Sequence, residues 1–355
     1  MCNIAGYVGP KKAEPILLDM LEREEKWDAY MSTGMAAVHA GKLTTERTLG
    51  PVAEFLKAHR PEAFPGNIGI AHSRSLGDYL WKAHPFTDRK ETLAVVLNGT
   101  GRDVQVEARE RFHEEISREL KAEGYFKPRE VTDEAENDLP YPLTEMIAAY
   151  TAREIDRGAC IAEAFANACS AFPGDFVSVM LHKDAPDRIY VCRITRPMAA
   201  ALCEGECYIA TTEFAFPADL KPVSVFSLPC LAVCEITAGG VIVTPFHVKG
   251  TAVEDVSPCV YREAYDRTVT FLRDRGGEPC DFDTIETEFY RNWHDLWHEP
   301  MVDCYWKAPD GCLKPYAAVT YEVLYELFRQ GRLDITYGPV RGRTRFLVSL
   351  KPEFL

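Results

Sequence analysis

The sequence has no long run of apolar residues. No stretch of its 355 residues is apolar enough to cross a bilayer, so a membrane protein is not expected. The amino-terminal segment, MCNIAGYVGPKKAEP, also lacks the basic region and long apolar stretch of a secretory signal. We therefore expect the protein to reside in the cytoplasm.

Positive charge is scarce as well. Lys and Arg number 40 against 54 Asp and Glu, which gives a formal net charge of −14, and the basic residues are scattered along the chain. Such a chain would repel phosphate backbones, so nucleic acid is not an expected partner. The 12 cysteines are better explained as reduced thiols, mostly small buried apolar residues, because nothing indicates secretion.

The length and composition indicate an ordinary globular protein with more than one core. Apolar residues make up 46% and charged residues 26%, which is typical of such proteins. Because 355 residues exceed the usual size of a single hydrophobic core, we expect one large domain and a smaller one.

The first 249 residues show strands at both ends and helices between them. Strands are predicted at 4–8, 35–38, 68–71, 92–97, 176–181, 188–193, 207–211, 223–226, 231–236 and 241–245, and helical patterns at 13–23, 106–123 and 143–172. A loop is predicted at 127–142. This order suits two stacked antiparallel sheets flanked by helices.

A second domain is predicted from about Gly250 to Leu355. Helices are expected at 261–275, 285–298 and 317–330, followed by a hairpin at 333–350 that turns at 338–342. Helices followed by a basic hairpin could form a winged helix that binds DNA, but this is also a common assortment in small domains, and the acidic balance argues against DNA binding.

Cysteine at position 2 has a specific chemical meaning. Removal of Met1 would leave a thiol and a free α-amine on the same residue. An α-amino group has a pKa of about 7.7 to 8.0, so its neutral fraction near pH 7 can accept the thiol proton directly or through a water. Cys2 would then be a nucleophile that carries its own base, and no histidine would be required.

Several further segments accompany Cys2 in a characteristic order: MCNIAGYVG, STGMAAV, GIAHSR, AHPF, VVLNGTG, GDFVSVMLHKDAPDRIYVCR and GECYIATTEFAFP. In order and spacing they resemble the glutaminase domain of glucosamine-6-phosphate synthase and its class II glutamine amidotransferase relatives, over roughly the first two-thirds of the chain. The resemblance implies an α+β fold, the four-layer αββα sandwich of N-terminal-nucleophile hydrolases.

The resemblance also implies roles for individual residues. Cys2 matches the family nucleophile, which attacks the amide carbon of the glutamine side chain, forms a thioester and releases ammonia. Asn98 and Gly99 match the pair whose N–H groups stabilise the oxyanion, each donor being worth about 2.7 to 4 kcal/mol. Without the resemblance, Asn-Gly would be only a common turn dipeptide.

The substrate's two charged groups need partners as well. Arg74 matches the arginine that holds the α-carboxylate, a role that suits the planar guanidinium group. Asp133 fits the family's acidic residue for the α-ammonium group by its distance from Gly124-Tyr125, and Asp138 is the alternative.

Other features depart from the family pattern. Asp28-Ala29 stand where relatives have Arg-Gly, and the segment after Arg74 is a few residues shorter, so glutamine specificity is less secure than nucleophilic chemistry. The tail of about 100 residues is too short for the sugar-isomerase half. The ammonia acceptor would then lie on another chain or on this tail, unless ammonia is simply released.

Two other functions stay open at this stage. The chain could be an N-terminal-cysteine hydrolase of a different amide, or a catalytically silent regulatory subunit. No cofactor or metal is expected, although His294 and His298 lie one helical turn apart near Cys304, which is compatible with zinc. The pairs Cys203/Cys207 and Cys230/Cys234 are better explained as buried thiols on strands.

Overall fold

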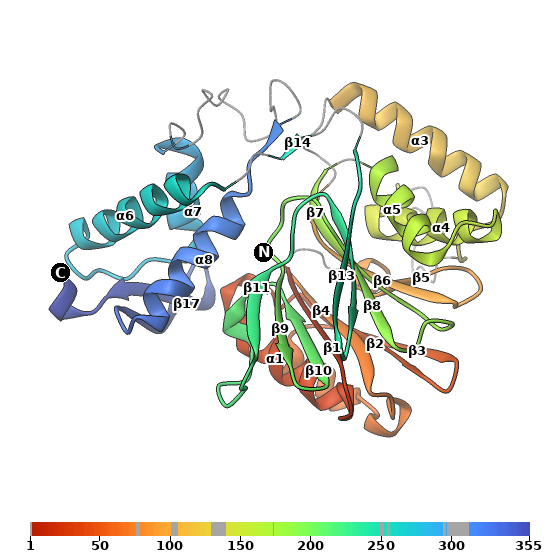
Figure 1. The fold of residues 1–355 in the computed structure, drawn as a ribbon, viewed down its shortest axis with the longest axis horizontal. Coiled ribbons are helices and arrows are strands. Elements are labelled where there is room, and N and C mark those ends of the chain that lie inside the picture. The colour runs from red at the N-terminus through yellow and green to blue at the C-terminus, as the bar shows by residue number, and fades with distance from the viewer. Residues whose placement is uncertain are drawn as a thin grey trace.

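Two antiparallel sheets lie face to face in the computed structural model (Figure 1). Residues 2–75, 79–100, 106–128, 140–172, 174–248, 252–253, 256–293, 296 and 312–355 are described. The first sheet has the strand order β11-β9-β10-β1-β4-β2-β3, and the second has the order β13-β12-β8-β7-β6-β5.

The strands of the first sheet are β1 (Asn3–Val8), β2 (Ser32–His39), β3 (Lys42–Leu49), β4 (Ile68–Arg74), β9 (Ala199–Cys203), β10 (Glu206–Ala210) and β11 (Ser224–Ser227). Those of the second are β5 (Phe86–Thr87), β6 (Leu93–Thr100), β7 (Asp175–His182), β8 (Arg188–Arg193), β12 (Ala232–Thr237) and β13 (Gly240–Pro245).

Alternation along the strands divides their side chains between the space inside the sandwich and its outer faces. Ile4 and Val8 of β1 pack with Ala94 and Val96 of β6 between the two sheets. Ala5 and Tyr7 of β1 and Val95 of β6 face outward instead, because successive side chains of a strand point to opposite faces. One apolar core therefore lies between the sheets, and each outer face needs a cover.

Helices pack on the outer faces of both sheets (Figure 1). Helix α1 (Ala13–Asp28) and the short α2 (Val52–Ala58) pack on the first sheet, and α4 (Leu143–Asp156) and α5 (Ile161–Ala171) pack on the second, with α3 (Val106–Ala122) beside α4. The layers follow the order helix, sheet, sheet, helix. The predicted fold class, a four-layer αββα sandwich, is confirmed.

Several predicted boundaries were wrong. The helical stretch 143–172 is two helices, separated at Gly158, whose φ of +99° a helix cannot continue through. Strands β3 and β9 and helix α2 were not predicted; β3, KLTTERTL, is a polar edge strand and carries no clear apolar alternation. The second predicted helix of the tail, 285–298, begins at Phe282 and ends at Arg291.

The C-terminal part contains α6 (Pro258–Asp274), α7 (Phe282–Arg291), α8 (Tyr316–Arg329) and the hairpin of β16 (Leu333–Val340) and β17 (Arg343–Leu350), and a parallel pair joins β14 (Ala252–Val253) to β15 (Cys312–Leu313). Cys280 forms an antiparallel bridge with Val348. These are the helices and the hairpin that the sequence predicted for this part. Helix α8 lies against the sandwich, where Tyr321 and Glu322 line a shared pocket.

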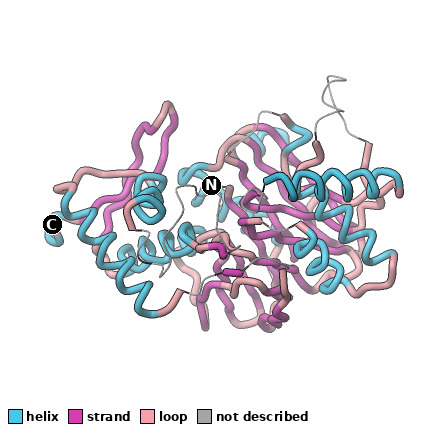
Figure 2. Tube along the Cα trace, turned by 90° about the horizontal axis from the view of Figure 1, so that it is seen from above, coloured by secondary structure: helices cyan, strands magenta, loops and turns pink. Residues whose placement is uncertain are grey.

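Trp27 of α1 joins the two parts of the chain through an aromatic cluster. Its ring lies 4.7 Å from that of Phe346, 5.7 Å from Tyr321 and 6.5 Å from Phe282, all in the C-terminal part. Figure 2 shows the C-terminal helices grouped at one side of the stacked strands. The C-terminal core therefore includes a residue of the first covering helix. In the described part of the chain, no helix has the length and apolar character that a membrane span requires.

Candidate active site

Cys2 lies at the start of β1, at one end of the sandwich. Strands β1 and β4 are antiparallel with Asn3 opposite Ser73, so Cys2 is next to the end of β4 at Arg74. Its Sγ lies 3.5 Å from Oγ of Ser75. Because Cys2 is two residues before Ile4, alternation directs its side chain toward the space between the sheets. Met1 lies outside the described residues.

Asn98 and Gly99 lie at the end of β6, on the facing sheet. Asn98 continues the inward-facing series of Ala94 and Val96. Its side chain is buried, with 2% of the residue exposed, and its Nδ2 has no hydrogen-bond partner among the described residues. Buried polar groups are nearly always paired, so an unpaired amide donor of this kind is a feature that a bound oxygen atom would satisfy.

Gly99 has a conformation that only glycine adopts easily. Its φ is +125°, and a Cβ added there would meet the carbonyl oxygen of Asp175 and lie 2.6 Å from Cα of Phe176. The close packing of β6 against β7 therefore excludes any side chain at this position.

Arg74 lies next to the thiol at the end of β4. It is partly buried, and burial lowers the pKa of its guanidinium group while the nearby Cys2 raises it. Its Nη1 donates a hydrogen bond to the carbonyl of Lys82. The structure thus brings Cys2 and Arg74 together. Asp133, Asp138 and residues 76–78 of the segment after Arg74 lie outside the described residues.

Four residues near this end of the sandwich were not singled out from the sequence. Ser75 contacts the thiol, and His72, His84 and Thr144 form a buried polar group behind the site. The alternation of β4 did contain a signal, because Ile68, Ile70 and His72 occupy every second position. It places the His72 side chain between the sheets.

A charged cluster connects the site's strands to the C-terminal part. Arg196 lies 2.5 Å from Asp175 at the start of β7 and 3.8 Å from Glu286 on α7. Burial raises the pKa of Glu286, and Arg196 opposes that effect. Because Asp175 is the register partner of Thr100, the cluster lies one residue from Gly99 along β6.

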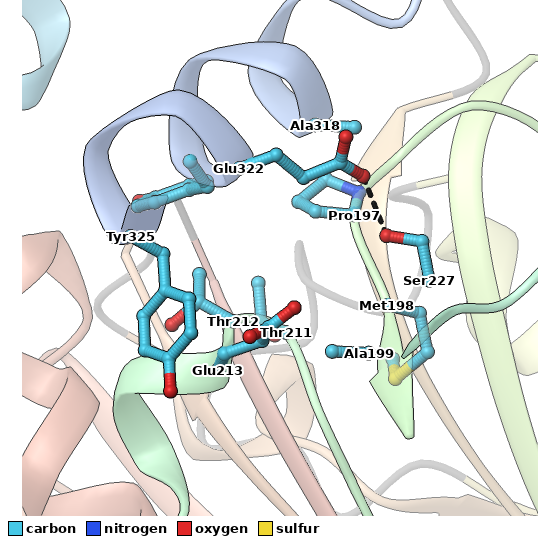
Figure 3. Close-up of a pocket in the computed structure, with 11 residues that line it drawn as sticks. Pro197, Met198, Ala199, Thr211, Thr212, Glu213, Ser227, Ala318, Glu322 and Tyr325 are labelled. Atoms are coloured by element: carbon cyan, nitrogen blue, oxygen red, sulfur yellow. Dashed lines mark hydrogen bonds between the residues drawn. The ribbon is translucent and has the colours of Figure 1, made fainter. Parts of the chain in front are cut away.

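A small pocket of about 20 Å³ lies between the same end of the sandwich and α8 (Figure 3). Thr212 and Glu213 line it from the sandwich, and Glu322 and Tyr325 line it from α8. Glu322 accepts a hydrogen bond from Ser227. Burial, together with the charge of Glu322, raises the pKa of Glu213 to about 7. The backbone N–H of Ile4 donates a hydrogen bond to Oγ1 of Thr211, which also lines the pocket, so the pocket is close to the start of β1.

Within the described residues, no group of three His, Cys, Asp or Glu side chains is arranged to hold a metal ion. His294, His298 and Cys304, the candidate zinc ligands, lie outside those residues. Cys203 and Cys207 do not share a strand as expected, because the turn between β9 and β10 separates them, and Cys230 precedes β12, which contains Cys234.

Comparison with curated proteins identifies relatives whose sequences are similar over about two-thirds of the chain. The isomerizing glutamine–fructose-6-phosphate aminotransferase of Pyrococcus horikoshii is 31% identical over 219 residues, which are 61% of this chain and 33% of that protein. The enzyme of the same name from Streptomyces coelicolor is 32% identical over 250 residues, 69% of this chain and 37% of the relative. The predicted resemblance is confirmed.

The matched residues span only about a third of the length of these relatives, 33% of the first and 37% of the second. No family model matches the sequence.

Solved structures share the fold. The glutamine phosphoribosylpyrophosphate amidotransferase of B. subtilis matches 74% of this chain and 52% of its own with a TM-score of 0.54 and 17% identity. A structure described as the allosteric regulatory enzyme of purine biosynthesis matches the same shares with a TM-score of 0.56 and 16% identity.

Proposed function

We propose that the chain hydrolyses the side-chain amide of glutamine and releases ammonia, with Cys2 as the nucleophile once Met1 has been removed. The names of the curated relatives support glutamine as the amide donor. The geometry at the end of the sandwich supports the nucleophile, because alternation from Ile4 and from Val96 directs Cys2 and Asn98 into the space between the sheets.

The reaction has two steps. The α-amine of Cys2 accepts the thiol proton, and the sulfur attacks the amide carbon of the side chain to give a tetrahedral intermediate. The amine returns the proton to the leaving nitrogen, and ammonia departs from a γ-glutamyl thioester. A water molecule then attacks the thioester, which yields glutamate and restores the thiol.

The unpaired amide of Asn98 is the observation that carries this proposal. Its Nδ2 is buried and has no partner in the part of the chain that the structure describes. A negatively charged oxygen in the transition state would accept this hydrogen bond, together with one from the backbone N–H of Gly99. A donor that is paired only in the transition state lowers the barrier without stabilising the ground state equally.

Arg74 is proposed to bind the α-carboxylate of the substrate. Its guanidinium group is partly desolvated beside Cys2 and is oriented by its bond to the Lys82 carbonyl. A carboxylate would offset the cost of that desolvation through charge-assisted hydrogen bonds. Asp133 or Asp138 is proposed for the α-ammonium group.

We also propose the division of the chain into an amidohydrolase domain, residues 1–249, and a smaller C-terminal domain, residues 250–355. The second domain offers a place for an ammonia acceptor or for contact with an acceptor subunit. Free release of ammonia is the remaining option.

The test compares amide hydrolysis before and after the amino terminus of Cys2 is exposed. Protein with a cleavable leader ending just before Cys2 should release no ammonia from glutamine, and cleavage should switch the activity on, because acylation removes the basicity of the amine. The glutamine analogue 6-diazo-5-oxo-norleucine should then alkylate Cys2 alone, as peptide mapping by mass spectrometry would show.

The matched controls are Cys2→Ala, which should be inactive, and Cys160→Ala, which changes an exposed cysteine and should be fully active. Equal rates before and after cleavage would refute the mechanism. Turnover of other amides but not of glutamine would refute the substrate, in favour of a hydrolase with a different specificity.

A further inference from the structure

Three buried polar side chains form a connected group between the two sheets and α4. His72 of β4, His84 before β5 and Thr144 in the first turn of α4 are 1%, 5% and 3% exposed. The described contacts join them in a row that ends at the carbonyl oxygen of Leu97, the residue before Asn98. The proposed mechanism uses none of the three.

The positions of the ring nitrogens indicate which atom donates and which accepts in each of these hydrogen bonds. Nε2 of His72 lies 3.0 Å from the Leu97 oxygen, which can only accept, so His72 carries its proton on Nε2. Nδ1 of His84 lies 3.1 and 3.0 Å from the two ring nitrogens of His72, and the rings meet at 83°. Because Nδ1 of His84 is nearly equidistant from both nitrogens of the His72 ring and the two rings are perpendicular, the N–H of His84 points at the face of the His72 ring.

The contact with Thr144 completes the assignment of protons to the two histidine rings. With the proton of His84 on Nδ1, its Nε2 is an acceptor, and Oγ1 of Thr144 donates to it over 2.8 Å. Both rings are therefore neutral in this arrangement. Burial supports this by lowering the pKa of His72 to about 3 and that of His84 well below its ordinary value.

The row reaches β6 where the strand lacks a neighbour. Strand β5 pairs with β6 only at Ala94 and Val95, and within the described residues no strand continues that edge toward Asn98. Leu97 lies beyond the last pair, and His72 supplies a side-chain donor to its carbonyl instead. The row thus holds the part of β6 that immediately precedes Asn98 and Gly99.

His84 also belongs to the segment whose backbone carbonyls accept hydrogen bonds from Arg74 and Arg47. Arg74 donates to the Lys82 carbonyl and Arg47 donates to the Ala83 carbonyl over 3.2 Å, directly before His84. The His84 carbonyl in turn packs against Gly34, where no Cβ would fit. The segment 82–84 is therefore bonded on several sides.

We propose that His72 is a positioning residue for the oxyanion-binding pair Asn98 and Gly99, and that His84 and Thr144 fix its ring orientation and tautomer. This rests on the proposed function. His72 exchanges no proton with Cys2. It holds the backbone of β6 at Leu97, so that the two N–H donors that follow point at the developing negative charge. Small displacements of such donors are costly, because about 1 Å can reduce the rate about 100-fold.

The test uses two amide replacements of His72. The amide nitrogen of His72→Gln can reach the place of Nε2, whereas that of the shorter His72→Asn reaches only the place of Nδ1. His72→Gln should keep kcat for glutamine within about threefold of the parent, and His72→Asn should lower it at least about 30-fold with little change in KM. Thr144→Val should lower kcat less, by about three- to tenfold, because the bond to Leu97 remains.

Alkylation of Cys2 by iodoacetamide separates positioning from proton transfer, because this reaction forms no oxyanion. Its rate should be the same in all three variants, and the acid limb of the kcat/KM profile should stay unchanged in His72→Gln. Equal kcat values for the Gln and Asn variants would overturn the proposal. Loss of iodoacetamide reactivity in both would also overturn it, since His72 would then be a base.

A backbone measurement tests the proposal independently of turnover. Amide hydrogen exchange at Asn98 and Gly99 should be faster in His72→Asn than in His72→Gln, because only the first releases the Leu97 carbonyl. If the parent protein does not hydrolyse glutamine, the proposed function fails, and this comparison still decides the role of His72. Equal exchange in the two variants would refute positioning.

Discussion

Replacement of Gly99 by alanine should show how closely the oxyanion-binding pair depends on packing between β6 and β7. The φ of +125° is strained for any L side chain, and such strain costs about 1 to 3 kcal/mol. The added Cβ would lie 2.6 Å from Cα of Phe176, against an ordinary contact of at least 3.4 Å, and closer still to the carbonyl oxygen of Asp175. Because both of these atoms belong to the backbone of β7, the strands must separate by more than the 0.8 Å by which 2.6 Å falls short of 3.4 Å.

We expect Gly99→Ala to reduce the free energy of unfolding by about 3 kcal/mol and kcat for glutamine by about 100-fold. Gly158→Ala is the matched control, since its φ is +99° but no atom lies within 4 Å of the added Cβ. It should cost only about 1 kcal/mol and leave kcat unchanged.

Urea unfolding gives the two stabilities, and ammonia release gives kcat. Similar losses of stability in the two variants would show that the clash with β7 contributes nothing. A Gly99→Ala protein with the parent's kcat would refute the view that this backbone N–H is held in place by close packing.

Two further predictions concern the contact between the two parts of the chain. Trp27→Ala should lower the free energy of unfolding by about 3 to 5 kcal/mol in a urea titration, because it removes the ring that packs against Tyr321 and Phe346. A loss below about 1 kcal/mol would mean that the sandwich and the C-terminal part do not stabilise each other. Glu213→Gln should stabilise the protein at pH 8 by about 1 to 2 kcal/mol, allowing for solvent screening, and have little effect at pH 4.5. The pKa of Glu213 is raised from 4.5 to about 7, so the folded chain binds this proton more tightly than the unfolded chain does. The parent therefore loses stability as the pH rises from about 4.5 to about 7. A difference between the thermal unfolding midpoints of the two proteins that does not change with pH would contradict this.

Local patterns in the sequence predicted most of the strands and helices, and the family resemblance supplied their arrangement in four layers. Period-two alternation located most strands, as in Ile4 to Val8, and helical spacing located α1 and α3, because each pattern reflects one face turned toward a core. Where the local pattern was weak, prediction failed. The polar strand β3 obtains its place from pairing with β2, a contact that leaves little trace in its own composition.

The chemistry of the candidate site was partly readable in the same way. Cys2, Arg74, Asn98 and Gly99 were identified through the resemblance of their segments to those of the family, and their roles stay predictions. The sequence alone could not reveal that the Asn98 amide is buried with no partner among the described residues, or that the backbone of β7 leaves no room for a side chain at Gly99, since both depend on contacts with segments distant in sequence.

The sequence by itself determined the kinds of elements, their order and the residues able to do chemistry, because these depend on neighbours close along the chain. Only the tertiary structure decided which distant residues meet. The row from Thr144 through His84 and His72 to Leu97 draws on four separate segments, and Trp27 joins a core built almost entirely from residues beyond 250. The physical reason is that burial and hydrogen bonding act through space, whereas a sequence pattern records only which face of each element will be buried.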